Sequence, residues 1–279
     1  MDFYLKDLKQ NEQVALIKLV TILREQERIS EDEFSTSAIC RFMKANECDI
    51  AKSLSQITES LKWRRTYNWK HVVDMDMDKV NTFHTMMKFG YYGEDPRGRP
   101  IRIMQPQPCN IDEQFVALGS DVIFAFQVGL MERSINIVFE LCSRKYGRHI
   151  SNQITIVDVK FLEIGKILTS SDMINFGRTK APLLQLNYPE LGFRGIIINA
   201  GPVFYSLWKV FSVFLNKKTV DKIRICNENY MHELLEVTSL DKIPVSLGGT
   251  CPYEIDNYPN FYDQEFYNSL QEKRLGLKK

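Results

Sequence analysis

The sequence predicts a mixed α/β fold, in which a helical N-terminal region precedes a mainly parallel β-sheet with flanking helices. Two short runs, residues 154–158 and 195–199, are rich in β-branched apolar side chains, as strands are. Long helical patterns separate such runs, and strands separated by helices favour a parallel sheet. The first ninety residues show helical spacing and no convincing strand.

Length and charge limit the class of protein. The 279 residues suggest one large core with a smaller helical unit attached. The 36 Lys and Arg residues balance 35 Asp and Glu residues, so we expect no nucleic-acid partner and only local contact with a membrane surface. The six cysteines form no Cys-x-x-Cys pair, and the N-terminus lacks a signal-peptide apolar stretch. We expect a cytoplasmic protein with reduced thiols.

The N-terminal region, residues 1–90, has the pattern of a helical unit. Asp49 can cap a helix in which apolar residues recur at spacings of four, three and four from Ile50 to Leu61. This spacing predicts one buried face. The apolar positions on which the helical prediction rests are Val14, Ile17, Leu23, Ile39, Phe42, Met43, Ile50, Leu54, Ile57 and Leu61.

The larger domain, residues 91–255, alternates strands and helices, and a C-terminal extension follows at residues 256–279. Turn residues, helix caps and stop signals set its expected elements. These are a turn at residues 95–98, a strand at 101–104, a helix at 117–146 ended by Gly147, a helix from Ser170 or Ser171 toward Leu186, a strand at 223–225 and a helix at 227–237.

The most apolar segment, residues 195–216, is as long as a bilayer span and carries one charge, Lys209. Asn199, Gly201 and Pro202 in its middle favour a strand that ends and a helix that begins there. That helix is apolar around nearly its whole surface, so it cannot be simply half-exposed. From the residues alone, a fully buried core helix is favoured over a functional lid. Its apolar positions are Val203, Phe204, Leu207, Trp208, Val210, Phe211, Val213, Phe214 and Leu215.

Catalytic signatures are weak. Cys142 and Arg148 match the Cys-x5-Arg loop of cysteine phosphatases, but Cys142 sits in a helical pattern with one glycine nearby, whereas that loop links a strand to a helix. The sequence has no GxSxG, GxxxxGK[ST] or GxGxxG motif, and no histidine has metal-ligand spacing. We therefore expect no enzyme activity, no metal and no cofactor. The histidines are His71, His84, His149 and His232.

Several motifs carry a resemblance to a known family. They include Leu-Asn-Tyr-Pro-Glu at residues 186–190 and Ile-Pro-x-x-Leu-Gly-Gly at residues 243–249, together with residues 41–45, 95–100, 155–158, 197–200 and 214–223. In order and spacing these motifs resemble the CRAL-TRIO lipid-binding family, over roughly residues 36–252. Within that family the sequence looks most like the secretory-pathway phosphatidylinositol transfer proteins.

The resemblance implies one phospholipid in an apolar pocket beneath a gate helix that opens on the membrane. The gate corresponds to residues 202–215, with Phe204, Leu207, Trp208, Phe211 and Phe214 on it. The family's phosphatidylinositol headgroup residues fall here on Glu190, Thr219 and Lys222, with Lys44 as a weaker candidate for a phosphate contact. The alternative for these residues is a plain surface ion pair.

The family's phosphatidylcholine site is matched less well. Its positions fall here on Gln153, Thr155, Arg102 and Met131. If Arg102 faces the pocket, it would repel a quaternary ammonium. The expected second ligand is therefore a phosphoinositide, or another anionic or apolar molecule.

The resemblance thus predicts a soluble, monomeric phosphatidylinositol-binding transfer protein that needs no cofactor beyond its lipid and contacts membranes transiently. Two alternatives stay open. The same fold can carry a neutral hydrophobe such as a retinoid, tocopherol or sterol, or it can serve as a lipid-sensing interaction scaffold. A cysteine phosphatase with Cys142 as its nucleophile is a third alternative, and it predicts an activity that Cys142→Ser abolishes.

Overall fold

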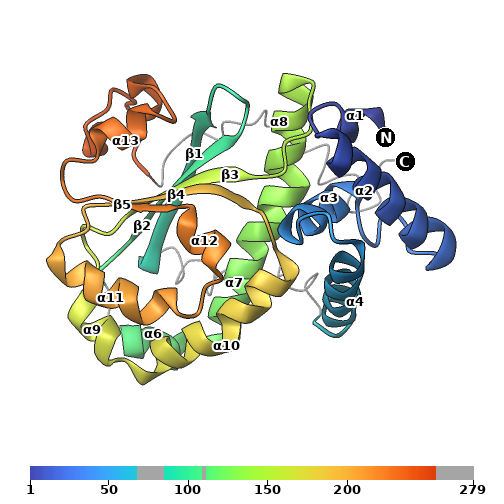
Figure 1. Ribbon diagram of the computed structural model, residues 1–279. Helices are drawn as coiled ribbons and strands as arrows, with labels where there is room; N and C mark the ends of the chain where they lie inside the picture. Colours follow the sequence, from blue (N-terminus) through green and yellow to red (C-terminus); the bar gives the residue numbers. More distant parts are fainter. Residues whose placement is uncertain (68–84, 109–110, 256–279) are drawn as a thin grey trace, which may run out of the picture.

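A five-stranded β-sheet forms the centre of the computed structural model (Figure 1). The structure describes residues 1–67, 85–108 and 111–255. The first strand pairs antiparallel with the second, and each later pair is parallel, which confirms the predicted fold class. In spatial order the strands are β1 (Met87–Glu94), β2 (Pro100–Pro106), β3 (Gln153–Asp158), β4 (Gly192–Ile198) and β5 (Ile223–Ile225).

The two faces of the sheet differ. One face packs against α13 (Met231–Leu235) and the segment after it, through isoleucines of β2, β3 and β4 that are fully buried. Because alternate residues of a strand point to opposite sides, the intervening residues face the other layer. That layer contains α6 (Ile111–Leu118), α7 (Ser120–Arg133), η3 (Ser134–Val138), α8 (Phe139–Tyr146), α9 (Ile164–Thr169), α10 (Ser171–Asn187) and α11 (Pro202–Ser212), as Figure 1 shows.

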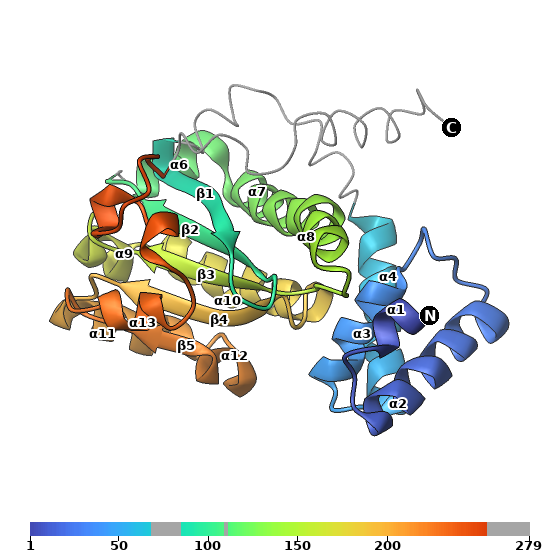
Figure 2. The same cartoon turned by 90° about the horizontal axis from the view of Figure 1, so that it is seen from above.

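The N-terminal helices form a group of their own beside the sheet domain (Figure 2). Ser35 and Asp49 cap its two later long helices, with their side chains accepting from Ala38 N at 3.1 Å and Lys52 N at 3.0 Å. Its members are α1 (Asp2–Leu5), α2 (Gln10–Thr21), η1 (Ile22–Gln26), α3 (Thr36–Ala45) and α4 (Ile50–Thr66).

The buried face of α2 leaves out two of the apolar positions on which the helical prediction rests. Val14 and Ile17 are 62% and 45% exposed, whereas Leu16 and Leu19 are fully buried with Leu23. Two apolar stripes run along this helix, and only one of them can face the small core of the N-terminal group. The expected positions Ile39, Phe42, Met43, Ile57 and Leu61 are buried, and Ile50 and Leu54 are half-buried against them.

Most helix boundaries in the larger domain follow the predicted signals. The long helix runs from Ser120 through a π-helical turn to Tyr146, and Gly147 ends it in the left-handed conformation at φ 60°. By length and composition this run could cross a membrane, but Phe124, Val128 and Phe139 are buried in the same core as Tyr188. These contacts are those of a core helix.

Two elements differ from the prediction. Strand β1 begins at Met87, inside the region expected to be helical, and its two glycines and Lys88 hide it from a search for β-branched runs. The helix expected at residues 227–237 is only α13, because Asn227 accepts from Asn229 N at 2.9 Å in a local turn. The expected C-terminal extension, residues 256–279, lies outside the described residues, as do His71 and His84.

Candidate lipid-binding pocket

Two hollows lie side by side on the helix-covered face of the sheet. One, the polar pocket, has a volume of about 350 Å³, and the other, the apolar cavity, about 340 Å³. Residues two apart on a strand point to the same side of the sheet. On each of three strands, one such residue lines the polar pocket and the residue two positions later lines the apolar cavity. These pairs are Arg102 and Met104 on β2, Thr155 and Val157 on β3, and Gly195 and Ile197 on β4.

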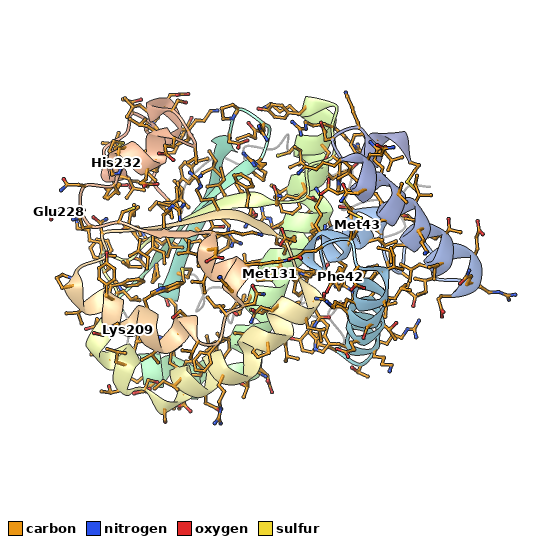
Figure 3. The ribbon with its side chains drawn as sticks, viewed as in Figure 1. Phe42, Met43, Met131, Lys209, Glu228 and His232 are labelled. Carbon is orange, nitrogen blue, oxygen red and sulfur yellow. The ribbon has the colours of Figure 1, made fainter. Side chains whose placement is uncertain are left out.

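Helix α11 forms one wall of the apolar cavity. Phe204 and Leu207 are buried, and Trp208 and Phe211 line the cavity with them. The opposite side of the same helical segment also carries apolar residues, and these are exposed: Val203 by 58%, Tyr205 by 47% and Val213 by 73%. The charged Lys209 is exposed as well (Figure 3). The helix is therefore not the fully buried core helix that its residues alone favoured.

Hydrogen bonds fix both ends of residues 202–215, the segment predicted to be a gate and called the gate segment below. At its start, Asn199 has the left-handed φ of 58°, and its Nδ2 donates to Asp158 Oδ1 at 2.7 Å. At its end, the Gln185 amide of α10 donates to Phe214 O at 2.7 Å and accepts from Asn216 N at 2.6 Å. The segment thus has an anchor at each end and apolar contacts between them.

Phe211 and Phe214 pack together over Gly177 of α10. Their ring centroids are 6.0 Å apart in an edge-to-face pair. A β-carbon at position 177 would lie 3.1 Å from an atom of each ring. The missing side chain of Gly177 therefore lets the gate segment lie close to α10. The five predicted gate residues all lie on the inner side of the segment or against α10.

The predicted headgroup residues come together in the polar pocket. Glu190, Thr219 and Lys222 all line it, and Lys222 Nζ lies 2.8 Å from Glu190 Oε2. Thr219 belongs to α12 (Lys217–Asp221), which Asn216 caps by accepting from Thr219 N at 2.8 Å. Glu190 has a left-handed φ of 58°, unusual for a residue with a side chain and typical of strained functional positions.

The N-terminal helices hold the chain just before Glu190. On α4, Gln56 Nε2 donates to Leu186 O at 3.0 Å, and Ser60 Oγ donates to Asn187 Oδ1 at 2.7 Å. Tyr188, the next residue, donates its hydroxyl to the buried Glu132 carboxylate at 2.7 Å, and burial followed by that charge raises its pKa. Sequence reasoning missed these contacts because they join residues more than fifty positions apart.

Lys44 is not among the residues that line the polar pocket, although its neighbour Ala45 is. Lys218 of α12 lines the pocket in this corner, and its Nζ donates to Ala45 O at 2.9 Å and lies 2.7 Å from Glu47 Oε1. It links α12 to the end of α3. The only sequence signal for this residue is its place directly before Thr219.

All four predicted second-ligand residues, Arg102, Met131, Gln153 and Thr155, also line the polar pocket. Met131 projects from α7 toward the middle of the molecule (Figure 3). The two predicted sites are therefore parts of one pocket. Its described lining holds four cationic side chains, Arg102, Arg194, Lys218 and Lys222, and a single carboxylate, Glu190, so an anion fits it better than a cation.

Cys142 and His149 both lie in packed surroundings. Cys142 is fully buried within α8, away from any loop that joins a strand to a helix. His149 is hydrogen-bonded to Ser37 Oγ at 2.8 Å, and burial, followed by the charges of Arg41 and Lys44, lowers its pKa to about 3. Among the described residues, no group of three or more His, Cys, Asp and Glu side chains is placed to hold a metal ion.

The parallel sheet thus carries a polar pocket and an apolar cavity next to each other, with helix α11 as one wall of the cavity. The sequence pattern of the CRAL/TRIO domain matches residues 84–249, and this chain belongs to the CRAL/TRIO family. The crystal structure of Sfh5 has a similar fold, with a TM-score of 0.68 at 15% identity over 97% of this chain and 99% of that one.

Several curated relatives are lipid transfer proteins by name. Phosphatidylinositol/phosphatidylcholine transfer protein SFH12 of Arabidopsis thaliana is 30% identical over 76% of this chain and 39% of its own length. SFH4 of the same plant is 30% identical over 76% of this chain and 34% of its own. This chain thus spans less than half of those two relatives. It matches 76% of the Sec14 cytosolic factor of Schizosaccharomyces pombe, at 25% identity over 79% of this chain.

Proposed function

We propose that this protein binds one phosphatidylinositol molecule and exchanges it with membranes through the gate segment. The observation that carries the proposal is the joint placement of Glu190, Thr219 and Lys222 in a polar pocket directly beside an apolar cavity. A phospholipid needs this combination, because it has a charged headgroup and apolar chains. The names of the relatives as phosphatidylinositol/phosphatidylcholine transfer proteins support the same class of ligand.

Each headgroup residue has a distinct chemical task in this proposal. Lys222 supplies a positive charge for the phosphate, and the Thr219 hydroxyl donates a hydrogen bond to it. Glu190 holds Lys222 in place through their 2.8 Å contact and can accept from an inositol hydroxyl. Because the pair is only partly exposed, the ligand phosphate competes with limited water for the Lys222 ammonium.

The gate follows from the physics of moving a lipid through water. Each methylene exposed to water costs about 0.8 kcal/mol, so a sixteen-carbon chain costs roughly 13 kcal/mol. A lipid must therefore pass from bilayer to cavity without full exposure. The gate segment suits this step because it has apolar residues on both sides: the inner side closes the cavity, and the exposed Val203, Tyr205 and Val213 can enter the bilayer. We expect the protein to act as a cytoplasmic monomer that contacts membranes only during exchange.

A transfer assay tests the proposal. Purified protein should move labelled phosphatidylinositol between vesicles well above the buffer rate, and Lys222→Ala should lower that rate by about tenfold or more, because a charged hydrogen bond to the phosphate is lost. Lys52→Ala is the matched control, since Lys52 is exposed on α4 away from the pocket, and it should transfer normally. A wild-type rate equal to buffer, or full activity in Lys222→Ala, would contradict the proposal.

A carrier of a neutral hydrophobe is the second candidate, and the observation that favours it is the apolar cavity, whose lining is mostly aliphatic and aromatic. Such a ligand makes no use of the Lys222 ammonium. It would therefore bind equally well to wild type and to Lys222→Ala, whereas phosphatidylinositol would not.

A further inference from the structure

Arg102, at the β2 end of the polar pocket, has no carboxylate to balance it among the described residues. The other three cations of the pocket each pair with an acid: Arg194 with Glu236 at 2.9 Å, Lys218 with Glu47 at 2.7 Å and Lys222 with Glu190 at 2.8 Å. Within the described part of the chain, Arg102 forms no ion pair. A half-buried guanidinium without a counter-charge is costly unless an anion joins it.

Neutral polar groups surround Arg102 and hold it in position. With its oxygen directed at Arg102, the buried Gln153 amide accepts from Nε and Nη2 at 3.2 Å each, and its nitrogen donates to the Tyr91 hydroxyl at 3.2 Å. The Tyr91 hydroxyl also lies 2.7 Å from Ser134 Oγ, and Thr155 Oγ1 lies 3.3 Å from the Gln153 amide. These contacts fix the guanidinium while Nη1 keeps its donors for a ligand.

The Arg102 end is separate from the headgroup residues at the other end. Arg102, Thr155, Gly195 and Ile223 occupy one row across four neighbouring strands, and Lys222 precedes Ile223. Three strand spacings span about 14 Å, so Arg102 and Lys222 mark opposite ends of the pocket. Gly195, in the middle of the row, contributes no side chain to the floor between them.

We propose that the Arg102 end binds the phosphate of a second lipid, an anionic phospholipid whose headgroup carries no cationic group. The planar fork of arginine matches phosphate oxygens, and the Arg102 Nη1 donors that the Gln153 amide leaves unused are available to bind them. A quaternary ammonium beside that phosphate would meet the unbalanced positive charge of Arg102, because the other three cations of the pocket are each paired with an acid. Arg102 thus selects against phosphatidylcholine. This inference rests on the proposed lipid-binding function of the pocket.

A competition experiment with the whole protein tests this selectivity. Lipid-free protein is incubated with vesicles that contain equal amounts of phosphatidylinositol, phosphatidylcholine, phosphatidic acid and phosphatidylglycerol, then reisolated, and its bound lipids are measured by mass spectrometry. We expect the anionic lipids other than phosphatidylinositol to exceed phosphatidylcholine by about tenfold or more, the worth of a charged hydrogen bond. Phosphatidic acid and phosphatidylglycerol distinguish a phosphate monoester from a diester as the preferred form.

Variants separate the two ends of the pocket. Arg102→Gln should remove most of the preference over phosphatidylcholine and leave phosphatidylinositol loading unchanged, which also shows that the variant is folded. Arg102→Lys should retain part of the preference, because the charge remains but the fork is lost. Lys222→Ala should lose phosphatidylinositol and keep the second lipid. Arg224→Gln, an exposed arginine of β5 outside the pocket lining, is the control and should change neither.

The outcomes distinguish this inference from the proposed function. Equal loading of phosphatidylcholine and the anionic lipids by wild type, an unchanged lipid profile in Arg102→Gln, or loading of phosphatidylinositol alone would each overturn the role of Arg102. Those results would leave phosphatidylinositol transfer intact. Failure to load phosphatidylinositol, with the anionic preference present and lost in Arg102→Gln, would contradict the proposed function and support the second site.

Discussion

The same strands form both faces of the sheet, but one face is closely packed and the other borders two hollows. On one face, Ile156 and Ile196 are fully buried against α13, with their neighbours on β2 and the segment after the helix. On the other face, Thr155 and Val157 leave room for the polar pocket and the apolar cavity. The contrast teaches that close packing is concentrated on one side of the sheet, while the other side retains volume for a ligand.

A substitution on the packed face should have the largest effect on stability. Ile156→Ala removes a fully buried side chain and should lower the free energy of unfolding by about 2–5 kcal/mol. Val157→Ala, its neighbour facing the apolar cavity, should cost about 1 kcal/mol, because that side chain borders an existing hollow. Denaturant unfolding of both variants measures the contrast. Equal losses would show that the two faces are packed alike.

Away from both faces of the sheet, His149 packs against the N-terminal helices and should contribute to the pH dependence of stability. Its pKa is lowered to about 3 when folded, mainly by burial, against an ordinary value of 6.5. Below pH 6.5 the unfolded chain therefore binds a proton that the folded chain does not, so stability falls as the pH drops toward 3. The loss should be about 1 kcal/mol per pH unit. His149→Gln should flatten the decline between pH 6.5 and 5, and an identical decline in both proteins would show that His149 is not its source.

A smaller effect is expected where the gate segment meets α10. Gly177→Ala places a β-carbon 3.1 Å from atoms of Phe211 and Phe214, so the rings must move outward by a few tenths of an ångström. The gain in helix propensity of about 1 kcal/mol offsets the lost contact, so overall stability should change little. Phosphatidylinositol transfer should change severalfold, because the substitution disfavours the closed position of the proposed gate. Gly165→Ala, where a β-carbon would have no contacts, is the control. Unaltered transfer in Gly177→Ala would mean that this contact does not hold the gate.

Much of the fold could be read from local signals. Gly147 ends its helix, Ser170 caps α10 by accepting from Met173 N at 3.2 Å, and Pro202 begins α11, each as its residue type predicts. Errors arose where local pattern does not decide the outcome. Two apolar stripes on α2 compete for one core. Glycines interrupt the aromatic residues of β1, and its pairing with β2 fixes it as a strand.

The site was harder to predict because its contacts are long-range. Glu190, Thr219 and Lys222 were found through family resemblance, and no spacing rule brings Lys222 to Glu190 across 32 positions. The Gln185 contacts that hold the end of the gate segment also join distant parts of the chain, as does the Gln153 amide beside Arg102. Such contacts depend on strand order and register, which a single sequence leaves open.

The identity of the lipid that the protein carries tests the central claim most directly. The full chain is purified under native conditions, and its bound lipid is extracted and identified by mass spectrometry, beside Lys222→Ala prepared in the same way. Phosphatidylinositol at about one molecule per chain in the wild type, strongly reduced in Lys222→Ala, is the predicted result. A retinoid, tocopherol or sterol in both proteins, or a stable protein complex with no lipid, would contradict the claim.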